Sequence, residues 1–189
     1  LEVKIADTHT KVSLGDQVDG TYSAHWNEGD RISVNGNISS EALISASNPS
    51  SARFEFAGAV LDYPFNILYP ASESNQVCFA AQQNYVEGSF EAGTTPMYAS
   101  VASATESIAL NHLSGVMRFN IKGATTLKKM VIKAESGAIA GVFSLDFASG
   151  ALTPMGETSS TLEYSFGEGF VLSAEEAKSF FVVMPCGEF

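Results

Sequence analysis

Thr161-Leu162-Glu163-Tyr164-Ser165-Phe166 is the stretch of this sequence that decides the fold class. Polar and apolar residues alternate along it, so Leu162, Tyr164 and Phe166 share one face of an extended chain. A period of two with one polar face is typical of a half-buried antiparallel strand. The stretch therefore predicts a strand that turns its two aromatic rings and its leucine into a core.

The same alternation recurs on both sides of this stretch. It is found in the ranges 31–35, 53–56, 107–111 and 118–122. In the last of these, Phe119 and Ile121 share a face, and Met117 joins them. Phe180 to Met184 is instead continuously apolar, which predicts a strand buried on both sides.

Turn residues separate these runs and helix signals are few. Turns are expected at Glu28-Gly29-Asp30, Asn35-Gly36, Lys122-Gly123, Ser149-Gly150 and Gly167-Glu168-Gly169, because glycine adopts positive φ at little cost. Ser173 to Lys178 resembles a capping box and predicts one short helical turn. The Ser- and Ala-rich range 39–51 is interpreted as a loop. Together these patterns predict an all-β, antiparallel β-sandwich with at most short helical turns, as a single domain over residues 1–189.

Composition agrees with this class and limits the partners. The chain has 189 residues, of which 45% are hydrophobic and only 16% charged, whereas helical bundles use many more charged residues. The formal net charge is -11, from 10 Lys and Arg against 21 Asp and Glu. That sign disfavours binding to nucleic acid and to anionic lipid, and it favours solubility.

The cysteines and the ends of the chain bear on the cellular compartment in which the protein functions. Cys78 and Cys186 both lie beside apolar residues, so we expect buried thiols, with a disulfide between them as the open alternative. The chain starts at Leu1 and shows no signal peptide, which fits an exported protein after processing and fits equally a chain trimmed for expression. It ends just after an apolar strand, so we expect further protein beyond Phe189.

No pattern of a catalytic site is found. His9, His25 and His112 lack metal-binding spacing, no Gly-x-Ser-x-Gly elbow is present, and Glu175-Glu176 is interpreted as a solvated pair. We therefore expect no enzyme, no cofactor and no resident metal.

Two kinds of binding site stay open from the residues alone. Loop calcium is one, at the pairs Asp16/Asp19 and Glu28/Asp30. The other is an aromatic platform for carbohydrate, for which the candidates near loops are Tyr22, Trp26, Tyr63, Tyr85 and Tyr98.

Three blocks resemble the fimbrillin family of Bacteroidetes, also called Mfa-like or FimA-like fimbrial proteins. The first is Lys11-Val12-Ser13-Leu14 followed by Trp26-Asn27-Glu28-Gly29-Asp30-Arg31-Ile32-Ser33-Val34. The second is His112-Leu113-Ser114-Gly115-Val116-Met117-Arg118-Phe119-Asn120-Ile121. The third runs from Leu127 to Ala134, continues with Ile139-Ala140-Gly141 and ends at Asp146.

Within these blocks the residues of the family motif are Trp26, Gly29, Asp30, His112, Leu113 and Phe119. Their physical roles can be predicted without the family. Trp26 would attach the turn to the core, and Gly29-Asp30 would make the turn, with Asp30 capping backbone N–H groups.

The resemblance implies transthyretin-like β-sandwich domains in an exported protein of the cell surface and outer membrane, held by a lipid anchor upstream of this chain. It implies the role of a fimbrial or cell-adhesion subunit. Its partners would be other fimbrial subunits, through a donated strand, or a host or bacterial surface receptor. We expect the exchangeable groove near the segment Leu1 to Leu14. The alternative function is a glycan-binding β-sandwich of a polysaccharide uptake system.

Overall fold

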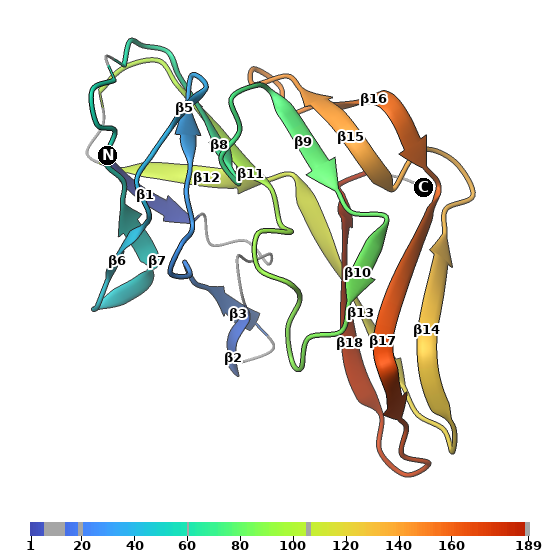
Figure 1. Ribbon diagram of the computed structural model, residues 1–189. Helices are drawn as coiled ribbons and strands as arrows, with labels where there is room; N and C mark the ends of the chain where they lie inside the picture. The colour runs from blue at the N-terminus through green and yellow to red at the C-terminus, as the bar shows by residue number, and fades with distance from the viewer. Residues whose placement is uncertain (6–13, 19–20, 60, 105–106, 188–189) are drawn as a thin grey trace.

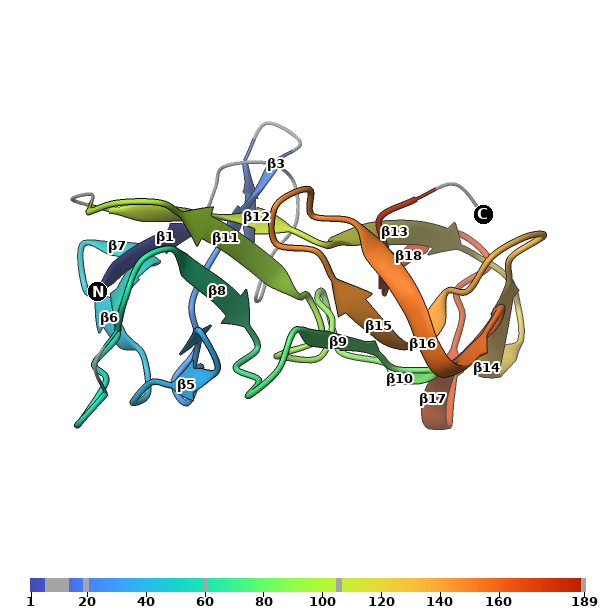
Figure 2. The same ribbon diagram turned by 90° about the horizontal axis from the view of Figure 1, so that it is seen from above.

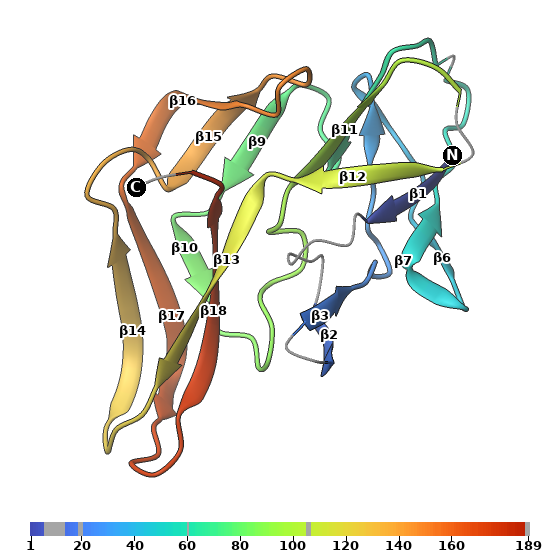
Figure 3. The same ribbon diagram turned by 180° about the vertical axis from the view of Figure 1, so that it is seen from behind.

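The computed structural model describes residues 1–5, 14–18, 21–59, 61–104 and 107–187 (Figure 1). The described part consists of strands, turns and loops without a helix, which confirms the all-β prediction. The strands form two lobes, one mainly from the early part of the chain and one mainly from the late part (Figures 1 and 3). We call them the N-lobe and the C-lobe.

The N-lobe is built on one sheet of short strands. Its members are β1 (Glu2–Ile5), β4 (Ser33–Val34), β5 (Asn37–Ile38), β6 (Leu43–Ser45), β7 (Asn48–Arg53), β8 (Phe65–Tyr69), β11 (Met97–Val101) and β12 (Ile108–His112). Their order in the sheet is β5-β4-β8-β11-β12-β1-β7-β6. A separate pair, β2 (Leu14–Val18) and β3 (Thr21–Ala24), follows β1. The core of this lobe includes Val3, Trp26, Ile32, Val34, Phe54, Ile67 and Leu110.

The C-lobe is built on longer strands. Its members are β9 (Gln76–Phe79), β10 (Gln82–Asn84), β13 (Ser114–Ile121), β14 (Thr126–Lys133), β15 (Ala140–Leu145), β16 (Leu152–Ser159), β17 (Thr161–Val171) and β18 (Lys178–Pro185). They form the sheets β10-β17-β14 and β16-β15-β9 and the pair β13-β18. Side chains of β14 and β17 pack against those of β13 and β18, as in a sandwich.

The lobes are joined by the chain and by a small core. The chain passes between them at β8–β9, β10–β11 and β12–β13, so no single cut in the sequence separates them. Leu68 of the N-lobe packs in one cluster with Val77 and Phe143 of the C-lobe, and Leu113 lies in the same cluster, where β12 gives way to β13. The extent of a single domain over residues 1–189 stays a prediction.

The clearest sequence patterns are confirmed. Leu162, Tyr164 and Phe166 of β17 are buried, and their neighbours on the strand are partly exposed. In β18, Phe180 and Val182 enter one core cluster, while Phe181 and Val183 enter another with Phe90. Asn35-Gly36 makes the two-residue hairpin between β4 and β5, with φ angles of 49° and 78°. Such a turn needs positive φ at both positions, and Asn-Gly provides it.

Several local predictions are wrong. The range 39–51 holds β6 and most of β7, whose pairing rests on backbone hydrogen bonds that its Ser, Ala and Asn side chains do not reveal. Gly167 and Gly169 do not end a strand. They lie inside β17, opposite a register shift between Leu127 and Lys129 of β14, where positive φ accommodates a bulge.

Further corrections concern a side chain, a turn and the sheet direction. Met117 does not join the core with Phe119, because 42% of it is exposed. The Ser173 hydroxyl accepts the N–H groups of Glu175 and Glu176 in a bend without a helical turn. Most pairings are antiparallel, but β1 with β12 and β10 with β17 are parallel.

Candidate functional site: the slot of the N-terminal strand

Strand β1 lies in the interior of the N-lobe sheet although it is the first strand of the chain. It pairs in parallel with β12, with Val3 opposite Ile108 and Ile5 opposite Leu110. On its other side it pairs antiparallel with β7, with Val3 opposite Ala52 (Figure 3). We call the space between β7 and β12 that β1 fills the β1 slot.

The side chains of β1 alternate between the core and the surface. Val3 is completely buried, and Leu1 packs against the same core cluster. Glu2 and Lys4 point outward, with their charged atoms 3.8 Å apart. Two backbone hydrogen bonds of 2.9 Å join Leu1 and Phe54 and extend the pairing beyond the strand. Strand β1 is therefore held by backbone pairing on both edges and by the contacts of Val3 with the apolar core.

Trp26 belongs to the same core cluster as Val3. Its ring meets Phe54 edge to face at 5.1 Å and Tyr69 at 5.2 Å, and only 3% of the residue is exposed. Its backbone N–H donates to the carbonyl of Pro49 in β7. The predicted role of Trp26, attaching the turn to the core, is confirmed.

Asp30 holds the turn that follows Trp26. Its carboxylate accepts the backbone N–H of Asn27 at 2.7 Å and the hydroxyl of Tyr69 at 2.8 Å. Gly29 precedes it with a φ of 88°, in the region that favours glycine. The predicted capping role is thus confirmed, and the bond to Tyr69 is an addition that the sequence did not reveal. Burial raises the pKa of Asp30, and these two hydrogen bonds oppose that effect.

The other motif residues lie elsewhere. His112 ends β12, and neither of its ring nitrogens has a hydrogen-bond partner among the described residues. Burial lowers the pKa of His112 to about 4. Leu113 lies in the cluster that joins the lobes, and Phe119 packs in the core of the C-lobe. The motif therefore marks three separate places in the core and not one site.

Neither cysteine has the environment that the sequence predicts. Cys78 and Cys186 are both exposed and both free, so neither the buried thiols nor the disulfide is found. In β9 the buried neighbours of Cys78 are Val77 and Phe79, and alternation turns the thiol outward. Burial of part of Cys186 raises the pKa of its thiol.

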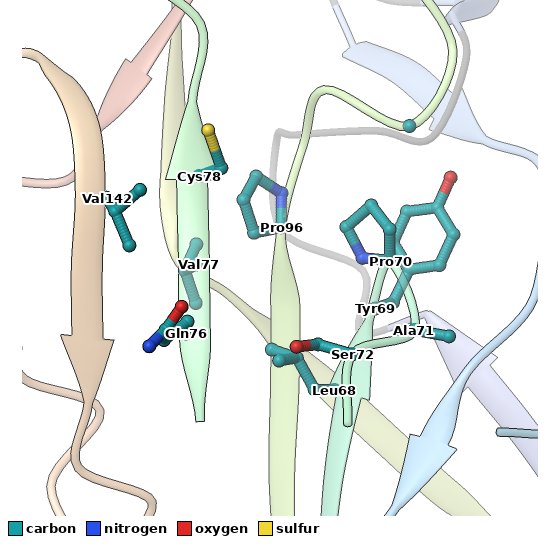
Figure 4. A pocket seen from close by; sticks show the side chains of 11 residues that line it. Leu68, Tyr69, Pro70, Ala71, Ser72, Gln76, Val77, Cys78, Pro96 and Val142 are labelled. Atoms are coloured by element: carbon teal, nitrogen blue, oxygen red, sulfur yellow. The ribbon is translucent and has the colours of Figure 1, made fainter. Parts of the chain in front are cut away.

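Cys78 borders a cavity of ≈ 340 Å³ between the lobes (Figure 4). Leu68, Pro70 and Pro96 line its N-lobe side, and Val77 and Val142 lie on the C-lobe side. Tyr69 also borders it, but its hydroxyl is bound to Asp30. A lining of this kind contains no acid and base pair that could carry proton-transfer chemistry.

The metal hypotheses find no support in the described part of the chain. No group of three or more His, Cys, Asp or Glu side chains lies together there. Asp30 uses its carboxylate within the protein, and Glu28 beside it is exposed. His9, Lys11, Asp19 and the side chains of Asp16 and Tyr22 lie outside the described residues. The described residues contain no helix that is long and apolar enough to cross a membrane.

No protein-family model, no curated protein and no solved structure matches this chain.

Proposed function

We propose that this chain is a structural or adhesive subunit of bacterial surface fimbriae that assembles by β-strand addition at the β1 slot. The observation that carries the proposal is the position of β1. A strand at the start of the chain fills the interior of a sheet between β7 and β12, and it supplies a buried side chain to the core.

A strand from another subunit would make more contacts in the β1 slot than at the edge of a sheet. In ordinary edge addition the incoming strand pairs on one side only. In the β1 slot it would pair on both sides and also place a side chain in the core where Val3 lies. Loss of β1 would leave the edges of β7 and β12 unpaired, and such edges readily accept another chain.

The partners that fit this proposal are other fimbrial subunits, with a surface receptor for an adhesive subunit. The proposed location is the cell surface and outer membrane, with a lipid anchor outside this chain. The resemblance of the Trp26 and His112 blocks to fimbrillins supports an exported role, and the acidic net charge of -11 favours solubility at the cell surface. No cofactor enters this function.

The experiment separates β1 from the chain without removing it. A specific protease recognition sequence is inserted between residues 6 and 13, and the purified protein is cut there. A fluorescent peptide with the sequence of residues 1–5 is then added, and its uptake is followed by fluorescence anisotropy. We expect the cut chain to exchange its strand for the peptide, and the uncut chain to exclude it.

A peptide with Val3→Asp is the matched control, because it keeps the backbone and loses the buried contact. We expect no uptake of this peptide. If the cut chain takes up both peptides equally or neither, the slot does not bind a strand as proposed. A chain lacking residues 1–5 that stays monomeric and as stable as the full chain would also contradict the proposal.

A further inference from the structure

A polar groove of ≈ 600 Å³ lies where the loop between β15 and β16 meets the N-lobe. Figures 1 and 2 show this loop beside β8 and β11. The side chains that matter in it are Asn66 and Ser100 from the N-lobe and Asn75, Ser144, Asp146 and Phe147 from the C-lobe. A second hollow of ≈ 180 Å³ shares Asn66, Asn75 and Phe147 and adds Asn35 and Glu73. The two hollows therefore share part of their lining.

The polar side chains of the groove are held in place by one another. The Ser100 hydroxyl donates to Oδ1 of Asn66 at 3.0 Å, and Oδ1 of Asn35 accepts the backbone N–H of Asn66 at 2.9 Å. Across the groove, Nδ2 of Asn75 donates to the Ser144 hydroxyl at 3.0 Å. These bonds fix Asn66 through its oxygen, and no hydrogen bond joins its Nδ2 to another described residue. Preorganised groups that keep unused donors and acceptors are those that orient a ligand.

The loop of the C-lobe is seated firmly on the N-lobe. Asp146 accepts hydrogen bonds from the N–H of Ala148 and the hydroxyl of Ser149, which close a tight turn. Gly150 lies against the hydroxyl of Tyr98 in β11, and a Cβ atom there would overlap it. The ring of Tyr98 lies 6.5 Å from that of Phe147. The groove is thus a fixed feature of the junction between the lobes.

The chemistry of the groove selects among ligand classes. Amide and hydroxyl groups both donate and accept, which matches the hydroxyl groups of a sugar. The half-buried ring of Phe147 offers an apolar face for the C–H side of a sugar ring. Asp146 is exposed, and its hydrogen bonds to Ser149 and Ala148 lower its pKa, so it stays charged. With Glu73 nearby and no cationic side chain in the lining, the groove repels anionic ligands.

We propose that this groove binds a short neutral oligosaccharide. The inference goes beyond strand addition and does not depend on it, since none of the groove residues belongs to β1, β7 or β12. Its volume falls within the range of about 300–1,000 Å³ that is typical of ligand pockets.

The test uses the whole chain and a defined set of sugars. Maltohexaose, laminarihexaose, mannohexaose and N-acetylchitohexaose are the neutral probes, and an oligogalacturonate of similar length is the anionic one. Binding is measured by isothermal titration calorimetry and by backbone NMR shifts. We expect at least one neutral probe to bind saturably and to shift the signals of Asn66, Asn75 and Asp146. The anionic probe should not bind.

Two variants and one matched control locate the site. Asn66→Ala removes the unused amide, and Phe147→Leu keeps apolar bulk but removes the ring. Each should weaken binding about fivefold to tenfold, as loss of one good contact does. Gln82→Ala also removes an exposed amide, but on β10 outside the groove, and should bind as the wild type does.

Thermal melting of each variant checks that it is folded. The NMR shifts of the wild type locate the binding site even if a variant fails to fold. If no neutral probe binds the wild type, the proposal is wrong. It is equally wrong if binding is unchanged in both variants, or if the shifts lie elsewhere.

Discussion

The two lobes bury their hydrophobic cores in different ways. In the N-lobe the strands that form the sheet have two to six residues, and the core is complete only when β1 lies between β7 and β12. In the C-lobe β17 has 11 residues and β13, β14 and β18 have eight each. Its core is a network of rings from Tyr85, Tyr164, Phe166, Phe170 and Phe180.

For the proposed strand addition, this difference would give the two lobes separate tasks. The long strand pairs β13–β18 and β14–β17 of the C-lobe bury their core without any strand of the N-lobe. The N-lobe places a chain-terminal strand where its removal opens two edges. A subunit that exchanges strands needs both properties, because a stable scaffold must persist while the slot is empty.

The largest loss of stability should follow from removal of an aromatic ring in the core of the C-lobe, which is the stable scaffold in this comparison. The Phe180 ring lies 5.0 Å from Phe166, 5.3 Å from Phe170 and 5.7 Å from Tyr85. Phe180→Ala should lower the free energy of unfolding by about 4 kcal/mol, through lost burial and a cavity. Urea denaturation measures the loss, and hydrogen exchange should place it in β13, β14, β17 and β18.

Val131→Ala on β14 is the control, because 57% of Val131 is exposed and the change should cost less than about 0.5 kcal/mol. Equal losses of protection in both lobes after Phe180→Ala would show that the lobes unfold as one unit. The contrast between scaffold and slot would then fail.

The second largest effect is a pH dependence of stability caused by His112. This residue ends β12 of the N-lobe, and β13 of the C-lobe begins two residues later. Burial lowers the pKa of His112 to about 4, from an ordinary value of 6.5. Between these values the unfolded chain binds a proton that the folded chain does not, so stability falls as the pH falls through that window. The full loss amounts to about 3 kcal/mol.

His112→Phe keeps an aromatic ring and removes the titration, so its unfolding free energy should vary less between pH 6.5 and pH 4. The difference between wild type and variant cancels other titrating groups, including Asp30, whose raised pKa acts in the opposite direction. If both proteins show the same pH dependence, His112 is not the buried neutral group that the geometry indicates.

The contrast between the lobes also explains what the sequence could reveal. The C-lobe strands β17 and β18 were predictable, because long alternating or continuous apolar runs report burial directly. The Asn35-Gly36 hairpin and the turn at Gly29-Asp30 were predictable as well, because local backbone geometry demands those residue types.

Other features depend on partners far away in the sequence. The range 39–51, which holds β6 and most of β7, resembles a loop in sequence, because its small polar residues pair through their backbones and leave no apolar pattern. The exposure of Cys78 follows from which face of β9 meets the core. The polar groove unites Asn66 with Asn75 and Asp146 only after the lobes have met, and the sequence pattern shows no sign of it.

The smallest of these effects is the one that tests the slot most directly. Val3 is completely buried, and Val3→Ala should lower the free energy of unfolding by about 2 kcal/mol. Since Val3 lies opposite Ala52 in β7 and Ile108 in β12, hydrogen exchange should become faster in those two strands. Protection of β13 and β18 should not change. Lys4→Ala, which alters an exposed side chain of the same strand, should leave both lobes as they are. Faster exchange in β7 and β12 alone would mean that β1 leaves its slot while the C-lobe stays folded, and strand addition requires that state.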